Sequence, residues 1–149
     1  GGFLDLDEEL EAGALRELVE ETGVRGIAPV FLGVYGTPGR DPRGRTISAV
    51  YLAAVQADDE STRTATAGDD AAEAAWHPLS GLPALAFDHD RIAADLKHGL
   101  PALVVNTSLL QRLLPREFSA TEFAVAAAAL GVGSIEDSLA RLGLGLGVL

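Results

Sequence analysis

Three carboxylates with helical spacing lie near the start of this chain. Glu17, Glu20 and Glu21 are three and four positions apart, so a helix would gather them on one sector of its surface. Carboxylates held this close repel one another unless a cation lies among them. Taken alone, such a cluster is more often a solvated acidic face. If it binds an ion, hard oxygen ligands favour Mg²⁺ or Mn²⁺, which commonly complete their shells with water and phosphate oxygens. With a metal bound, the cluster would therefore be suited to chemistry on phosphate groups.

A helix over residues 8–22 is needed to position these carboxylates. Asp7 is the expected N-cap, and acidic residues in the first turn favour the positive end of the helix dipole. Gly23 is the expected glycine after the last turn, because it adopts a left-handed conformation without strain. The apolar face of this helix consists of Ala14, Leu15, Leu18 and Val19.

The carboxylates belong to a longer pattern, G-x5-E-x7-R-E-U-x-E-E-x-G-U with U aliphatic. Its first glycine is Gly2, its first glutamate is Glu8, and its arginine is Arg16. This pattern resembles the Nudix box, the motif of hydrolases that cleave nucleoside diphosphates linked to another moiety. The complete match favours a metal site over a solvated helix face.

The resemblance implies an α/β fold, a Nudix-type α/β/α sandwich around a mixed sheet, in which the box forms a loop-helix-loop. It also implies that the Gly2 carbonyl is a metal ligand, together with the carboxylates of Glu17, Glu20 and Glu21. Mg²⁺ or Mn²⁺ is the implied cofactor.

Two further box residues are implied to support the site. Arg16 would orient Glu17 through a charge-assisted hydrogen bond, and Glu8 would support the site across the loop. The implied reaction is attack of a metal-activated water on a diphosphate phosphorus, with the metal also neutralising the leaving phosphate.

A basic loop follows the box. Residues 27–35 and 46–55 read as two strands of a hairpin, because they are rich in apolar, β-branched and aromatic residues. The connecting residues 36–45 contain Gly and Pro and include Arg40 and Arg43. This loop resembles a segment of the ADP-ribose pyrophosphatase-like branch of the Nudix family. Arg40 and Arg43 are therefore expected either to contact substrate or to order their loop.

One further acidic residue is expected from the region after the hairpin. Residues 57–70 are polar and small, and residues 71–79 resemble a strand-to-loop segment of the family. Nudix enzymes often recruit an additional ligand or general base near this point, and sequence does not choose among three candidates. These candidates are Asp69, Asp70 and Glu73.

The segment around residues 86–92 resembles the same branch and opens a helix. Asp88 is the expected N-cap, and His89 is expected to have a structural role rather than to contact substrate. Trp76 is expected to be a core or rim aromatic, with stacking on a base as the alternative.

The last third of the chain is expected to form a separate helical segment. We divide the chain into a Nudix hydrolase domain over 1–100 and a C-terminal segment over 101–149. In the latter, Ser119 or Thr121 starts a helix through Leu130, a glycine turn follows, and residues 134–142 form a last helix. This arrangement resembles a degenerate winged helix, as in Nudix-type transcriptional regulators that sense ADP-ribose. An ADP-ribose-sensing regulator is therefore the alternative function.

Charge favours the enzyme over the regulator. The net charge is -11, and the C-terminal segment holds more acidic than basic residues, which disfavours binding to nucleic acid. There is no Cys and no long apolar run, so we expect a cytoplasmic protein that does not contact membranes.

We accordingly expect a Nudix pyrophosphohydrolase that acts on a small-molecule nucleoside diphosphate derivative. ADP-ribose is the first choice of substrate, and oxidised nucleoside triphosphates are the alternative. Family members are commonly homodimers, often through N-terminal strands. Because the chain starts directly on the box, we expect it to be N-terminally truncated and to lack those strands.

Overall fold

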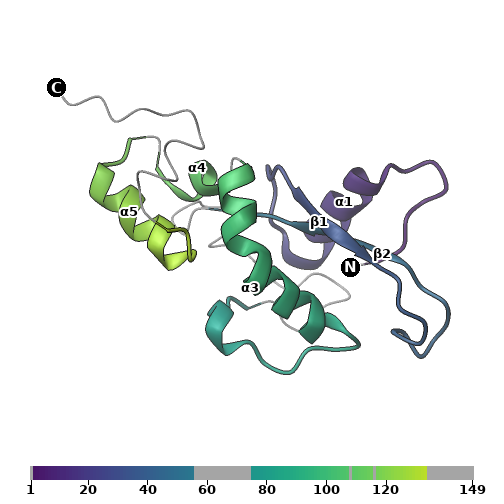
Figure 1. Cartoon of the computed structure of the whole chain (residues 1–149). Helices are drawn as coiled ribbons and strands as arrows, with labels where there is room; N and C mark the ends of the chain where they lie inside the picture. The colour runs from purple at the N-terminus through teal and green to yellow at the C-terminus, as the bar shows by residue number, and fades with distance from the viewer. Residues whose placement is uncertain (1, 56–74, 108, 116, 134–149) are drawn as a thin grey trace. The chain divides into compact units, whose positions relative to one another are not determined.

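The computed structural model describes residues 2–55, 75–107, 109–115 and 117–133 (Figure 1). The chain divides into two compact units, residues 1–93 and residues 94–149. Among the described residues are α-helices and a two-stranded antiparallel sheet, so the predicted α/β class is confirmed. No helix in these ranges combines the length and the apolarity needed to span a membrane.

Helix α1, Leu10–Thr22, carries the acidic cluster. It ends as predicted at Gly23, which has a φ of 72° and donates its N–H to the Val19 carbonyl at 2.8 Å. The prediction that Asp7 is the N-cap was wrong, because Glu9 occupies that position without a side-chain cap. Residues 5–8 form a turn instead, in which the Glu8 N–H donates to the Asp5 carbonyl at 3.2 Å.

The predicted hairpin is confirmed and its strands are shorter than predicted. Strand β1, Val30–Tyr35, pairs in antiparallel fashion with β2, Ser48–Leu52. Phe31 lies opposite Tyr51, and their rings meet edge to face with centroids 5.5 Å apart. The register shifts between Phe31 and Gly33. The hairpin lies beside α1 through a contact between α1 and β2, which places the acidic helix against the sheet (Figure 1).

A short 3-10 helix, η1, Leu79–Gly81, precedes the long helix α3, His89–Asn106. Asp88 immediately precedes α3, as predicted, and its carbonyl accepts a hydrogen bond from the Ile92 N–H at 3.2 Å. Its carboxylate has another partner, described below. Helix α3 continues through Pro101 to Asn106.

The second unit contains two further helices, α4, Leu109–Leu113, and α5, Ala120–Ala129. Ser119 caps α5 in a capping box with Glu122, which confirms the predicted start of this helix. Gly131, with a φ of 72°, follows its end. Helices α4 and α5 contact each other, and the buried apolar side chains of this unit are Val104, Leu109, Leu110, Leu114, Phe123, Ala127 and Val132. The predicted last helix, 134–142, lies outside the described residues.

Candidate functional site

Arg16 fastens the loop before α1 to the helix itself. Its Nε donates to Glu8 Oε1 and its Nη2 to Glu8 Oε2, both at 2.9 Å. Nη2 also donates to the Phe3 carbonyl at 3.0 Å. Two parallel hydrogen bonds from a guanidinium fix both distance and orientation. The loop of residues 3–8 is therefore held against α1 by one side chain.

The same guanidinium also gathers the acidic cluster. Nη1 donates to Glu17 Oε1 at 2.8 Å and to Glu20 Oε2 at 2.9 Å. These contacts, above all the hydrogen bonds to Glu8, raise the pKa of Arg16, which stays charged. Hydrogen bonding to Arg16 is in turn the main cause that lowers the pKa of Glu8 below its ordinary value. A single positive charge thus contacts three carboxylates.

Gly2 lies directly against the carboxylate of Glu17. A Cβ built on Gly2 would lie 2.2 Å from Glu17 Oε2 and 2.3 Å from Oε1, far inside van der Waals contact. Any larger residue at this position would require the Glu17 carboxylate or the backbone to move. The structure therefore brings together the Gly2 backbone and Glu17, two of the ligands that the box resemblance implies.

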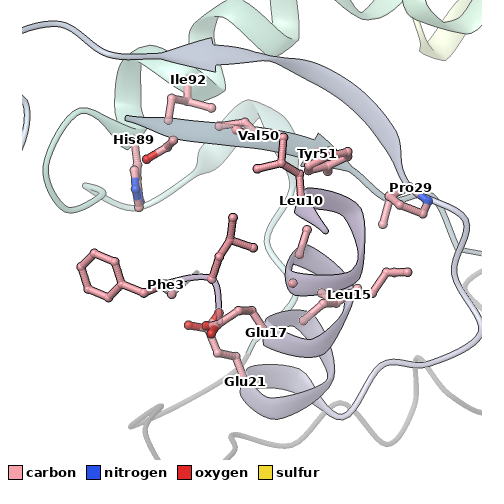
Figure 2. A pocket seen from close by; sticks show the side chains of 18 of the residues that line it. Phe3, Leu10, Leu15, Glu17, Glu21, Pro29, Val50, Tyr51, His89 and Ile92 are labelled. Atoms are coloured by element: carbon pink, nitrogen blue, oxygen red, sulfur yellow. The ribbon is translucent and has the colours of Figure 1, made fainter. Parts of the chain in front are cut away.

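A cavity of about 800 Å³ opens beside these residues. Glu17 and Glu21 line it, and Figure 2 shows both side chains extending from one side of α1 toward the backbone near Phe3. The opposite wall includes Val50 and Tyr51 of β2, and His89 lies at the far side of the same view (Figure 2). The acidic residues therefore face a space large enough for a small molecule.

The oxygen donors suit a hard divalent cation. Within the described ranges, no three His, Cys, Asp or Glu side chains are gathered closely enough to hold one. Arg16 binds an oxygen of Glu17 and an oxygen of Glu20 in this arrangement. The proposed donor set nevertheless consists of carboxylates on one helical sector and the backbone of Gly2, which lies against the Glu17 carboxylate. Oxygen donors of this kind are the ligands that Mg²⁺ or Mn²⁺ requires.

The two loop arginines are placed differently. Arg40 forms a two-point ion pair with Asp88, at 2.8 Å from Nε and 2.7 Å from Nη2, and its side chain is only 6% exposed. Arg43 pairs with Asp41 and is 68% exposed. Both arginines line the cavity. Of the two predicted roles, Arg40 has contacts that order the loop. The guanidinium of Arg43 is exposed and is therefore accessible to a ligand in the cavity.

Some predicted residues lie outside the described part of the chain, and some structural residues were not predicted. Asp69, Asp70 and Glu73 belong to the first group. Gly13 belongs to the second: it is buried in α1, where a Cβ would lie 2.2 Å from Leu4 Cδ2 and 2.9 Å from Glu8 Oε2. The sequence did offer a signal for Gly13, because it lies inside the expected helix. Glycine inside a helix is unfavourable and usually occurs where another residue packs closely against it.

The described fold and cluster define an α/β protein with an acidic loop-helix-loop. A model of the NUDIX domain matches residues 1–96, which is more than half of the chain. The chain belongs to the NUDIX family.

A curated relative and several solved structures extend this comparison. The ADP-ribose pyrophosphatase of Methanocaldococcus jannaschii is 44% identical over 95 residues, which are 64% of this chain and 53% of that protein. The chain thus spans about half the length of this curated relative. A MutT/nudix family protein from Enterococcus faecalis is 28% identical, with a TM-score of 0.71 over 99% of this chain and 68% of that one.

The C-terminal helices are included in some of these similarities. NrtR of Shewanella oneidensis is 25% identical, with a TM-score of 0.69 over 95% of this chain and 67% of that one. A structure of the same protein complexed with a 27mer DNA is equally similar. The likeness to NrtR therefore continues beyond residue 96, where the NUDIX match ends.

Proposed function

We propose that this chain is a divalent-metal-dependent hydrolase that cleaves the diphosphate of a nucleoside diphosphate derivative, with ADP-ribose as the preferred substrate. The observation that carries the proposal is the contact of Arg16 with Glu8, Glu17 and Glu20 beside a cavity. Similarity to an ADP-ribose pyrophosphatase supports the choice of substrate.

The contacts of Arg16 with Glu8, Glu17 and Glu20 support the roles proposed for these residues. Glu17, Glu20 and Glu21, with the Gly2 carbonyl, would hold Mg²⁺ or Mn²⁺, which when bound would supply positive charge to the diphosphate and acidify a water. Arg16 orients Glu17 and Glu20 through its Nη1, and Glu8 fixes the orientation of Arg16.

The chemical balance of the reaction is simple. One water adds to one phosphorus of the diphosphate, and the bond between that phosphorus and the bridging oxygen breaks. The bridging oxygen leaves with the other phosphate, and the protons of the water are released to solvent or to a base. ADP-ribose would thus give AMP and ribose 5-phosphate. One of Asp69, Asp70 and Glu73, outside the box, would serve as the base.

The test is hydrolysis of ADP-ribose, in the presence and absence of Mg²⁺, by the chain and two variants. Glu17→Gln removes a proposed ligand while keeping its shape, and Glu11→Gln removes an exposed carboxylate from the same helix as a matched control. We expect the first variant to lose at least about a hundredfold in rate, in line with the loss of one preorganised charge-stabilising group. Equal rates for the two variants would remove Glu17 from the site.

A second function, an ADP-ribose-sensing regulator, is favoured by one observation. The similarity to NrtR covers 95% of this chain, including α4 and α5. One observation argues against this function. Helices α4 and α5 contain a single basic residue, Arg112, whereas contacts of basic residues with phosphates supply most of the affinity for DNA. Binding of a labelled 27mer duplex at physiological salt, combined with no hydrolysis of ADP-ribose, would favour the regulator.

A further inference from the structure

We propose that Phe87 is the stacking surface for the aromatic base of the substrate and thereby sets the preference for nucleoside-containing diphosphates. This inference rests on the proposed function, since Phe87 lines the same cavity as Glu17 and Glu21. It concerns which half of the substrate is recognised, whereas the acidic cluster concerns the diphosphate.

The segment that carries Phe87 is fixed to the basic loop at several points. Asp88 accepts two hydrogen bonds from Arg40, which is almost fully buried and also donates to the Ser48 hydroxyl of β2. Arg91 donates to the Thr37 hydroxyl at 3.3 Å. The start of α3 and the basic loop are therefore joined at two residues that follow Phe87.

Phe87 itself is held in an unfavourable backbone conformation. Its φ is 56°. Among the residues that the structure describes, Phe87 is the only one other than glycine with a positive φ. This conformation strains an L-residue, and such strain persists where surrounding contacts determine it, often at binding sites. Here, the contacts of Asp88 and Arg91 with the basic loop hold the backbone of Phe87 in this conformation. The strained backbone places an aromatic ring at the cavity wall.

The Phe87 ring is exposed and restrained in a way that suits stacking of a planar base. Half of Phe87 is exposed, at 51%, although it lines a cavity whose remaining walls are largely apolar. The Arg43 guanidinium carbon lies 5.0 Å from the ring centroid, and the His89 ring meets Phe87 edge to face at 5.9 Å. A cation over the ring and a second ring beside it restrict its orientation. An ordered, half-exposed aromatic ring is the surface on which a nucleobase stacks.

The chain supplies a closely matched control residue. Phe31 on β1 is also 51% exposed and also has one edge-to-face aromatic neighbour, Tyr51 at 5.5 Å. It does not line the cavity. Phe31→Leu therefore removes an aromatic ring of the same exposure without touching the proposed subsite.

The experiment measures equilibrium binding of AMP and of ribose 5-phosphate by calorimetry, without metal, to the wild-type chain, Phe87→Leu and Phe31→Leu. We expect Phe87→Leu to weaken AMP binding about tenfold and to leave ribose 5-phosphate binding unchanged, because base stacking contributes this much per base. Phe31→Leu should bind AMP as the wild type does. No binding of AMP by the wild type, or equal losses in both variants or for both ligands, would overturn the proposal.

A measurement on the wild type covers the case in which Phe87→Leu fails to fold. With ring-labelled phenylalanine, AMP should shift the Phe87 resonances and leave those of Phe31 in place, and ribose 5-phosphate should shift neither. If AMP left the Phe87 resonances unshifted, the proposed stacking would be contradicted. Binding of AMP at Phe87 without hydrolysis of ADP-ribose would defeat the proposed function alone, whereas hydrolysis that is indifferent to Phe87→Leu would defeat the subsite alone.

Discussion

Arg16 and Glu8, eight positions apart in the chain, face each other through two parallel hydrogen bonds of 2.9 Å. The pair joins a loop residue to a helix residue, and Glu8 is only 14% exposed at its side chain. Glu8 therefore decides where the Arg16 guanidinium points. Arg16 in turn decides the positions of Glu17 and Glu20.

The first prediction concerns this support. Glu8→Gln keeps the shape of the side chain but loses its charge, so one of the two hydrogen bonds from Arg16 loses its acceptor and the other goes to a neutral amide oxygen. We expect metal-dependent hydrolysis to fall about tenfold, as for other residues that orient a ligand. Steady-state rates measured against Glu9→Gln, an exposed neighbour, check this. A rate equal to that of the control would show that Arg16 needs no partner in the loop.

The second prediction concerns the close approach of Gly2. Gly2→Ala would place a methyl group 2.2 Å from Glu17 Oε2, so the backbone or the carboxylate must move. We expect Mn²⁺, followed by electron paramagnetic resonance, to bind at least about tenfold more weakly. Gly44→Ala is the matched control, because no atom lies within 4 Å of a Cβ there. Equal Mn²⁺ affinities in the two variants would separate the Gly2 backbone from the metal site.

The third prediction concerns pH. The hydrogen bonds from Arg43, its side chain first and its backbone second, lower the pKa of Asp41 from 3.8 to about 2. Because the pKa is lowered on folding, this contribution to stability is complete above about pH 4 and is lost as the pH falls through about 2. Carboxyl chemical shifts should show Asp41 titrating near pH 2.

Two substitutions in the same loop test the cause of that shift. Arg43→Met removes the donor side chain and should return the midpoint of Asp41 toward 3.8. Arg45→Met removes an arginine that donates to the Gly36 and Thr46 carbonyls instead, and should leave the midpoint low. A low Asp41 midpoint in Arg43→Met would assign the shift to another group.

The fourth prediction concerns the second unit. The Ser119 hydroxyl accepts a hydrogen bond from the Glu122 N–H at 3.2 Å, and Glu122 Oε2 accepts one from the Ser119 N–H at 2.7 Å. Ser119→Ala should destabilise α5 by about 1 kcal/mol. Faster amide hydrogen exchange around the buried Phe123 measures this loss. Thr121→Ala, in the first turn of the same helix, should have a smaller effect. Similar exchange in both variants would assign the stability of α5 to packing alone.

Local chemistry explains which features could be predicted from the sequence. Gly23 and Ser119 end and begin helices because of conformations and hydrogen bonds that involve only a few neighbouring residues. The spacing of Glu17, Glu20 and Glu21 places them on one helical sector for the same reason. Asp7 failed as a cap because the turn at residues 5–8 competes with the helix for those positions.

Contacts between distant residues explain what could not be predicted. Asp88 was recognised as the residue before a helix, but its pairing with Arg40 spans 48 positions and follows from tertiary packing. The positive φ of Phe87 likewise depends on how that segment is held, since phenylalanine has no local preference for this conformation. Gly13 was overlooked because its neighbours, Leu4 and Glu8, come from the preceding loop.

The pairing of Arg40 with Asp88 has a consequence for how this sequence can change over generations. Each residue satisfies the charge of the other where solvent has little access, so losing either one leaves an uncompensated ion. The two positions should therefore change together or not at all, although they are 48 positions apart in the sequence. An exchange of the two residues, Arg40→Asp with Asp88→Arg, should restore more folded protein than either change alone.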